Sequence, residues 1–220
     1  MTEAITSWWE YMASRPEQLW ERTTEHLVLV GWAVLVATLI AVGSGILVHR
    51  VRWLRAPWLS ASGVFLTIPS LALFALFIPL VGLGFKPALI ALVMYAILPV
   101  LRNTVTALDG VDPAVIESAK GMGLNSRQRL LRVELPLAWP VILTGVRVSA
   151  LLSTGIAAIA VLIGYGGLGH FIQSGINRYP LPTSVERIWT GTALTVLLAL
   201  ALDGVIGVIQ RLTTPAGLRQ

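Results

Sequence analysis

Five long apolar stretches limit the folds open to this 220-residue chain more than any other feature of its sequence. The first covers residues 27–48, and its 22 residues make roughly 33 Å of helix at ~1.5 Å per residue, enough to cross a hydrocarbon core of about 30 Å. The other four cover residues 59–81, 88–105, 139–163 and 188–209, whereas the amphipathic segment 169–176 is too short to span. The pattern predicts an all-α, polytopic membrane protein with about five transmembrane helices.

The composition supports the same class. Apolar residues make up 55% of the chain and charged residues 12%, and the mean hydropathy is +0.78. A soluble domain carries about 25% charged residues, so this chain has too little polar surface to cover a water-soluble globule. It contains no cysteine, which excludes disulfides and thiolate metal sites.

The basic residues orient the predicted spans. Cytoplasmic links of membrane proteins are enriched in lysine and arginine, and five spans place the two termini on opposite sides. We therefore expect the N-terminus outside and the C-terminus inside. The predicted cytoplasmic residues are Arg50, Arg52 and Arg55 after the first stretch, Lys120, Arg127, Arg129 and Arg132 after the third, and Arg211 and Arg219 in the tail.

The ends of the chain differ from the spans. Residues 1–26 contain five glutamates, two arginines, three tryptophans and one tyrosine, and they lack the basic start of a cleaved signal peptide. We expect them to form a leader helix on the membrane surface, although a partly disordered polar leader fits equally well. The transmembrane domain then covers residues 27–212, with a cytoplasmic link at 106–138, and residues 213–220 form a cytoplasmic tail.

A search for catalytic motifs indicates that the chain is not an enzyme. Neither of its lysines lies in a phosphate-binding loop, and its three histidines have no metal-site spacing. Ser44 lacks the first glycine of an intramembrane serine-protease motif, and Asp203 is the sole acidic residue in a span. We therefore expect no catalytic residue, metal or cofactor in this chain, and we expect Asp203 to pair with Arg147.

Proline and glycine mark the spans unevenly. Ile68-Pro69-Ser70 interrupts the second stretch, and the carbonyl that a proline frees must find another partner in lipid. Such a position faces either the helix bundle or a transport pathway, or it is a kink that shapes packing. Close helix contacts are expected at Gly43, Gly45, Gly145, Gly204 and Gly207.

The link at 106–138 contains the signals of two short helices. Asp112 followed by proline is typical of a helix start, and Gly123 is placed to end that helix in a left-handed conformation. Asn125 or Ser126 can cap a second helix, which Leu135-Pro136 should end.

One face of the first short helix is apolar. Val115, Ala119 and Met122 share it by their i, i+4, i+7 spacing. Such a helix at the membrane surface suits either docking into a groove of a cytosolic partner or lying on the bilayer.

The same link resembles the cytoplasmic signature E-A-A-x3-G-x9-I-x-L-P of ABC importer permeases. The matching positions are Glu117-Ser118-Ala119, Gly123, Val133 and Leu135-Pro136. Ser118 stands in place of the first alanine of the signature, and Val133 in place of its isoleucine. The resemblance implies a type I ABC importer permease fold. It also implies that these residues couple the chain to an ATP-hydrolysing subunit, with residues 113–122 as the coupling helix.

Three further segments look like the osmoprotectant branch of that family, which imports glycine betaine, choline, carnitine or proline betaine. They are residues 68–73, 98–104 and 163–169, and the resemblance covers about residues 27–212. It implies a non-hydrolytic, multi-pass subunit in a prokaryotic cytoplasmic (inner) membrane that forms a translocation pathway by alternating access. The implied partners are an ATPase pair that binds ATP and Mg²⁺, an extracytoplasmic substrate-binding protein, a second permease copy or paralogue and the lipid bilayer, but no nucleic acid.

The glycine-rich segment 164–169 lies on the outer side in this topology. It fits either an outer gate or docking surface, or a simple turn. The candidate gate or pathway residues are Pro69, Ser70, Gly164, Tyr165, Gly166 and Gly167. A permease for methionine or another amino acid is the nearest alternative function, and a passive channel or secondary carrier, which would need no docking link, is a more distant one.

Overall fold

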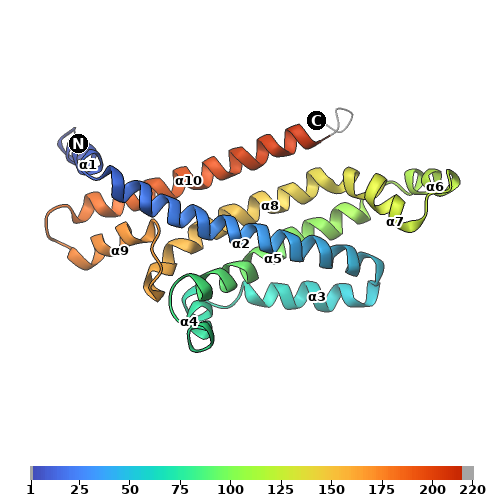
Figure 1. Ribbon diagram of the computed structural model, residues 1–220, viewed down its shortest axis with the longest axis horizontal. Coiled ribbons are helices and arrows are strands. Elements are labelled where there is room, and N and C mark those ends of the chain that lie inside the picture. Colours follow the sequence, from blue (N-terminus) through green and yellow to red (C-terminus); the bar gives the residue numbers. More distant parts are fainter. Residues whose placement is uncertain (1, 215–220) are drawn as a thin grey trace.

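The computed structural model describes residues 2–214 and is helical throughout that range apart from short connections. Figure 1 shows an elongated bundle in which the long helices run along one axis. The elements are α1 (Thr2–Ala13), α2 (Pro16–Arg50), α3 (Arg52–Phe65), α4 (Ser70–Val81), α5 (Phe85–Asp109), α6 (Pro113–Gly121), α7 (Ser126–Arg129), η1 (Leu130–Glu134), α8 (Leu135–Ala157), η2 (Ala158–Ile163), α9 (Gly169–Arg178) and α10 (Ser184–Thr213).

The core lies where α5 packs between α2 and α8. The most apolar stretch of α5 is 67% buried, whereas that of α10 is 0% buried, so α10 leaves its apolar surface uncovered. Small residues bring the helices together: a Cβ on Gly45 would lie 2.7 Å from Thr104, and one on Gly145 would lie 2.8 Å from Asn103. The predicted close contacts at Gly43 and Gly204 are wrong for residues 2–214, since nothing lies within 4 Å of a Cβ there.

The predicted span count is met only if one broken span is counted. Four helices of the described chain are long and apolar enough to cross a membrane, and α3 with α4 makes a fifth that bends by 95°. Pro69 lies at the bend, and the carbonyl of Ile68 accepts a hydrogen bond from the Tyr95 hydroxyl at 2.5 Å. A side chain of α5 thus satisfies a carbonyl that the break leaves free.

The helix that contains the first predicted span begins before that span. Helix α2 starts at Pro16, so residues 16–26 continue the helix of residues 27–48 and do not form one helix with residues 2–13. Helix α1 is a separate element that packs on α10, where the Trp8 indole donates to the Thr190 hydroxyl at 2.9 Å. Of the predicted tail 213–220, residues 215–220 lie outside the described part of the chain.

The predicted helix end at Leu135-Pro136 is wrong. The chain stays helical from Ser126 to Ile163 and absorbs the proline by a π turn, η1. Pro136 has no N–H for the ordinary i→i−4 bond, and widening the preceding turn accommodates that loss. The π turn also brings Arg129 and Glu134, five residues apart, into an ion pair of 2.6 Å.

Candidate functional sites

The short helix α6 projects from one end of the bundle (Figure 1). Its start is capped by the Asp112 carboxylate, which accepts the N–H of Ala114 at 2.8 Å. Its end is closed by Gly123 at φ 81°, and the N–H of Leu124 reaches back to the carbonyl of Ala119 at 3.2 Å. The predicted helix and its left-handed glycine are therefore confirmed, and so is the cap at Asn125, which forms a capping box with α7.

The surface of α6 differs from the predicted apolar stripe. Ala119 is buried (1% exposed) inside the chain, whereas Val115 and Met122 are exposed. Glu117 and Ser118 are also exposed. The surface open to a partner therefore combines these four side chains. Among the other signature residues, Val133, Leu135 and Pro136 are half-buried in η1 and at the start of α8.

Both ends of the α6 segment are tied to the turn between α2 and α3. Asp109, just before the segment, pairs with His49 at 2.9 Å and with Arg55 at 2.5 Å. Just after it, the carbonyl of Ser126 accepts a hydrogen bond from Arg50 at 2.9 Å. Sequence reasoning missed these contacts, because the arginine cluster was interpreted through topology alone and no local pattern pairs it with Asp109.

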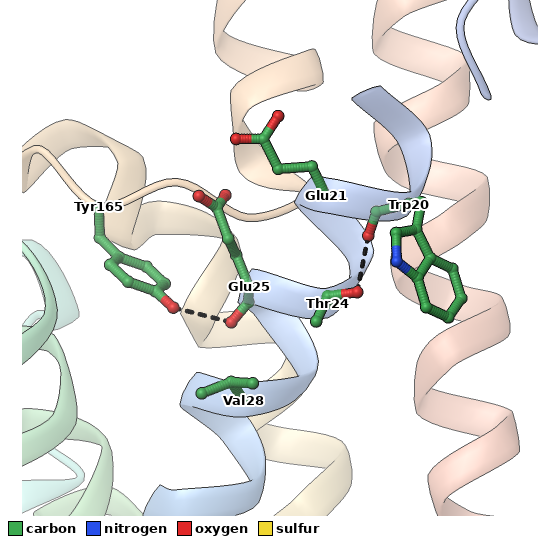
Figure 2. Close-up of a pocket in the computed structure, with 6 residues that line it drawn as sticks. All are labelled: Trp20, Glu21, Thr24, Glu25, Val28 and Tyr165. Atoms are coloured by element: carbon green, nitrogen blue, oxygen red, sulfur yellow. Dashed lines mark hydrogen bonds between the residues drawn. The ribbon is translucent and has the colours of Figure 1, made fainter. Parts of the chain in front are cut away.

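The glycine-rich loop lies at the other end of the bundle, between η2 and α9 (Figure 1). Gly164 and Gly167 both have positive φ, 81° and 83°, which a side chain would oppose. The N–H of Gly84 bonds to the carbonyl of Ile163 at 2.9 Å, which joins the loop to the turn before α5. On its other side, the Tyr165 hydroxyl donates to the carbonyl of Glu25 at 2.8 Å (Figure 2).

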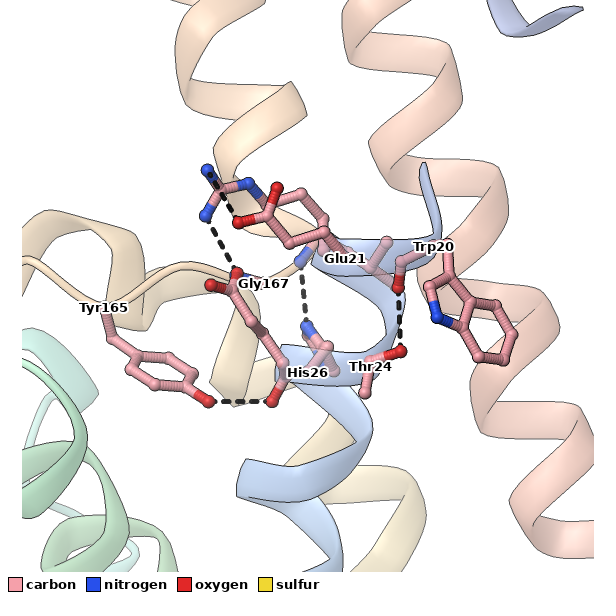
Figure 3. Close-up of polar contacts among 9 residues, drawn as sticks. Trp20, Glu21, Thr24, His26, Tyr165 and Gly167 are labelled. Atoms are coloured by element: carbon pink, nitrogen blue, oxygen red, sulfur yellow. Dashed lines mark hydrogen bonds and ion pairs between the residues drawn. The ribbon is translucent and has the colours of Figure 1, made fainter. Parts of the chain in front are cut away.

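Helix α2 holds the loop through side chains as well (Figure 3). The Glu25 carboxylate accepts the N–H of Gly167 at 2.7 Å and pairs with Arg22 at 2.8 Å. Burial, reinforced by the negative charge of Glu25, raises the pKa of Tyr165, so its hydroxyl remains a protonated donor. The loop is therefore a fixed structure and not an unattached turn.

His26 completes this connection and is a residue that sequence reasoning missed. It is 1% exposed, and its Nδ1 accepts the N–H of Leu168 at 3.2 Å (Figure 3). Because Nδ1 is an acceptor, Nε2 carries the proton and donates to the carbonyl of Thr154 at 3.0 Å. One neutral imidazole thus joins α2, the loop and α8. Its place at the junction between the polar residues 21–25 and the apolar stretch 27–48 is a sequence signal that could have indicated this role.

The remaining pathway candidates lie apart from the loop's polar contacts. Pro69 and Ser70 begin α4, and α4 packs against η2, which leads into the loop. For residues 2–214, no polar contact joins either side chain to Gly164, Tyr165 or the glycines that follow.

A second charged site lies between α8 and α10, where both side chains are partly exposed. Arg147 on α8 and Asp203 on α10 form a two-pronged ion pair, with Nε to Oδ1 at 2.7 Å and Nη2 to Oδ2 at 2.6 Å. This confirms the predicted pairing. Nearby, Gln210 donates to the carbonyl of Pro140 at 2.7 Å, so polar contacts fix α10 to α8 over several turns. The described residues contain no group of three acidic or histidine side chains that could hold a metal ion.

Comparisons with known proteins agree with this architecture. Residues 33–214 match the family model described as binding-protein-dependent transport system inner membrane component. The chain is 41% identical to the osmoprotectant import permease protein OsmW of Salmonella typhimurium, over 95% of this chain and 98% of that one. It is 38% identical to the choline transport system permease protein OpuBB of Bacillus subtilis, over 96% and 95%.

The fold also has a solved counterpart. The chain is similar to an inward-facing structure of the MetNI methionine ABC transporter, with a TM-score of 0.78 and 23% identity over 90% of this chain and 97% of that one. At this identity the likeness concerns the fold alone. The prediction of a multi-pass inner-membrane permease that is distinct from the ATPase is confirmed. The chain belongs to the family of binding-protein-dependent transport system inner membrane components.

Proposed function

We propose that the chain is the permease subunit of an ATP-driven importer of quaternary ammonium osmoprotectants such as glycine betaine, choline and carnitine. The observation that carries this proposal is the near full-length identity of 38–41% to permeases whose names state osmoprotectant or choline transport. A permease for methionine is supported only by a fold likeness at 23% identity, so it is the weaker candidate.

We infer that the N-terminus lies outside and the C-terminus inside. In support, the α2–α3 turn, α6, α7 and the C-terminal end of α10 gather at one end of the bundle, and α1 and α9 at the other (Figure 1). The first end carries most of the arginines, as expected for a cytoplasmic end under the positive-inside rule. In this orientation residues 27–212 are the permease domain and 106–138 its cytoplasmic coupling loop.

The exposed end of α6 is the proposed contact with the ATPase. Glu117, Ser118 and Met122 are exposed on a helix that projects from the bundle, and Gly123 fixes its direction. ATP and Mg²⁺ are bound by the ATPase pair, whose closure moves α6 and switches the membrane bundle between outward and inward openings. Val133, Leu135 and Pro136 connect this motion to α8.

At the outer end, we propose that the glycine-rich loop, with Pro69 and Ser70 at the start of α4, forms a gate or a docking surface for the separate binding protein. Its fixed attachment to α2 supports docking, because a rigid surface loses less conformational entropy on association.

A second permease subunit, either another copy or a paralogue, completes the pathway. The uncovered apolar surface of α10 supports such a contact. Bacillus subtilis relatives come in pairs by name, since the choline transport system has permease proteins OpuBB and OpuBD, which are 38% and 33% identical to this chain.

The test is uptake of labelled glycine betaine at high salt in cells with and without this gene, with choline, carnitine, proline and methionine as unlabelled competitors. Loss of betaine uptake on deletion, with competition by the quaternary ammonium compounds, is the expected result. Retained betaine uptake together with lost methionine uptake would overturn the substrate class and keep the family.

A further inference from the structure

A pocket at the outer end of α2 has a chemistry that the family assignment does not explain. It has a volume of about 410 Å³ and opens between α2 and the glycine-rich loop (Figure 2). Five of its six lining residues come from two neighbouring faces of α2, and the sixth comes from the loop. The lining residues are Trp20, Glu21, Thr24, Glu25, Val28 and Tyr165.

The aromatic wall on the loop side is held in place. The Tyr165 hydroxyl is bonded to the carbonyl of Glu25 at 2.8 Å, and its ring packs against Phe85 with centroids 5.6 Å apart. Trp20, on the opposite side of the pocket, is 76% exposed, so it can close over a ligand without disturbing the core. The pocket therefore offers one rigid and one adaptable aromatic surface.

The charge of the pocket is negative. Glu21 and Glu25 both line it, and Arg22, which pairs with Glu25 at 2.8 Å and lies 3.9 Å from Glu21, balances only one of them. The Thr24 hydroxyl donates back to the carbonyl of Trp20 at 2.8 Å, so its proton is already used within the helix. The Glu25 carboxylate is already bonded to Arg22 and to the N–H of Gly167, so Glu21 supplies the unbalanced negative charge. One such charge and two aromatic rings, with an apolar floor at Val28, suit a cation that needs no hydrogen-bond acceptors.

We propose that this pocket is an outer binding site for a quaternary ammonium group. The proposal rests on the proposed function and deepens it, because it gives the permease its own site for the positive end of the transported solute. A methylated ammonium attracts aromatic faces and carboxylates and loses little hydration on entry. The two glutamates disfavour a free carboxylate, so a cation such as choline binds more tightly here than a zwitterion such as glycine betaine.

The test uses the purified transporter complex without its binding protein, in nanodiscs of lipids that lack choline. Saturation-transfer NMR measures binding of choline and of 3,3-dimethylbutan-1-ol, a neutral molecule of nearly the same shape. We expect choline to bind and the neutral compound not to bind. Trp20→Ala and Glu21→Gln should each weaken choline binding about tenfold, as expected when one aromatic or ionic partner of a cation is removed.

Matched variants separate the pocket from general surface effects. Glu17→Gln removes an exposed glutamate one turn earlier on α2, and Trp9→Ala removes an exposed tryptophan of α1; both should leave choline binding unchanged. Tyr165→Phe keeps the ring and should retain most of the binding, whereas Tyr165→Leu should lose it. The proposal would be overturned if the neutral compound bound as tightly as choline. It would also be overturned if Glu17→Gln weakened choline binding as much as Glu21→Gln does.

The failure of this inference is distinguishable from that of the proposed function. Uptake of quaternary ammonium solutes by the complete importer without choline binding to the isolated complex would overturn the pocket assignment alone. Choline binding to the pocket in a complex that imports no quaternary ammonium solute would overturn the proposed substrate and keep the pocket.

Discussion

The conformation of Gly123 provides a direct test of the coupling segment. Its φ is 81°, and nothing lies within 4 Å of a Cβ placed on it, so a substitution there meets backbone strain and no steric obstacle. An L-residue in the left-handed region costs about 1–2 kcal/mol. If the ATPase recognises α6 in this geometry, that strain shifts the segment away from the docked form by a factor of roughly 5–30.

We therefore expect Gly123→Ala to lower ATP-driven uptake by roughly 5–30-fold and Gly123→Val to lower it further, because β-branched residues tolerate positive φ least. Gly123→Asn should retain most of the uptake, since asparagine is enriched in the left-handed region. The assay is uptake into proteoliposomes that contain the complete importer, corrected for the amount of permease in the membrane.

Gly121 supplies the positional control. It lies two residues earlier, inside α6, without positive φ, and a Cβ there also meets nothing within 4 Å. Gly121→Ala should leave uptake unchanged or slightly raised, since alanine favours the helix. If Gly123→Val and Gly121→Ala supported equal uptake, the geometry of this turn would not matter for coupling and the assigned role of the segment would be refuted.

Two further predictions concern the ion pairs. Asp109→Asn removes the ion-pair partner of Arg55, and exposed pairs contribute about 0.2–1 kcal/mol each. We therefore expect normal amounts of permease in the membrane but a two- to fivefold drop in solute imported per ATP hydrolysed. An unchanged ratio of solute to ATP would contradict an anchoring role for this pair. Asp203→Asn and Arg147→Gln should each lower the thermal stability of the purified permease, and the double variant should lose less than the two losses added together. Strict additivity in that cycle would show that the pair does not stabilise the contact of α8 with α10.

Local signals in the sequence predicted the helices and their caps. Asp112 followed by proline, and a glycine after one apolar face, were enough to predict α6 and its left-handed end. These features depend on residues within a few positions of one another, so the local sequence is enough to predict them. The same holds for the long spans, whose length and hydropathy alone predict membrane crossing.

The connections between distant segments could not be predicted in this way. The bonds of His26 to Leu168 and Thr154, and of Asp109 to Arg55, join residues that are far apart in the chain, and no local pattern selects the partner. The π turn before Pro136 was missed for a related reason. A proline permits either a helix end or a widened turn, and packing of α8 against α5 and α2 favours the continuous helix.

The continuous helix from Ser126 to Ile163 connects the α6 segment to the glycine-rich loop. Its 38 residues extend roughly 57 Å at ~1.5 Å per residue, from the coupling segment to the glycine-rich loop. Around Gly145 it packs closely against α5, because a Cβ on Gly145 would already lie 2.8 Å from Asn103, and close-packed contacts of this kind resist deformation. Departures from α geometry fall near its ends, in η1 and η2. Under the proposed coupling role, a displacement of α6 would be absorbed at the π turn or transmitted along α8 to the loop that Glu25 and His26 hold. The turn at Leu130–Glu134 would then be the point where coupling is gained or lost.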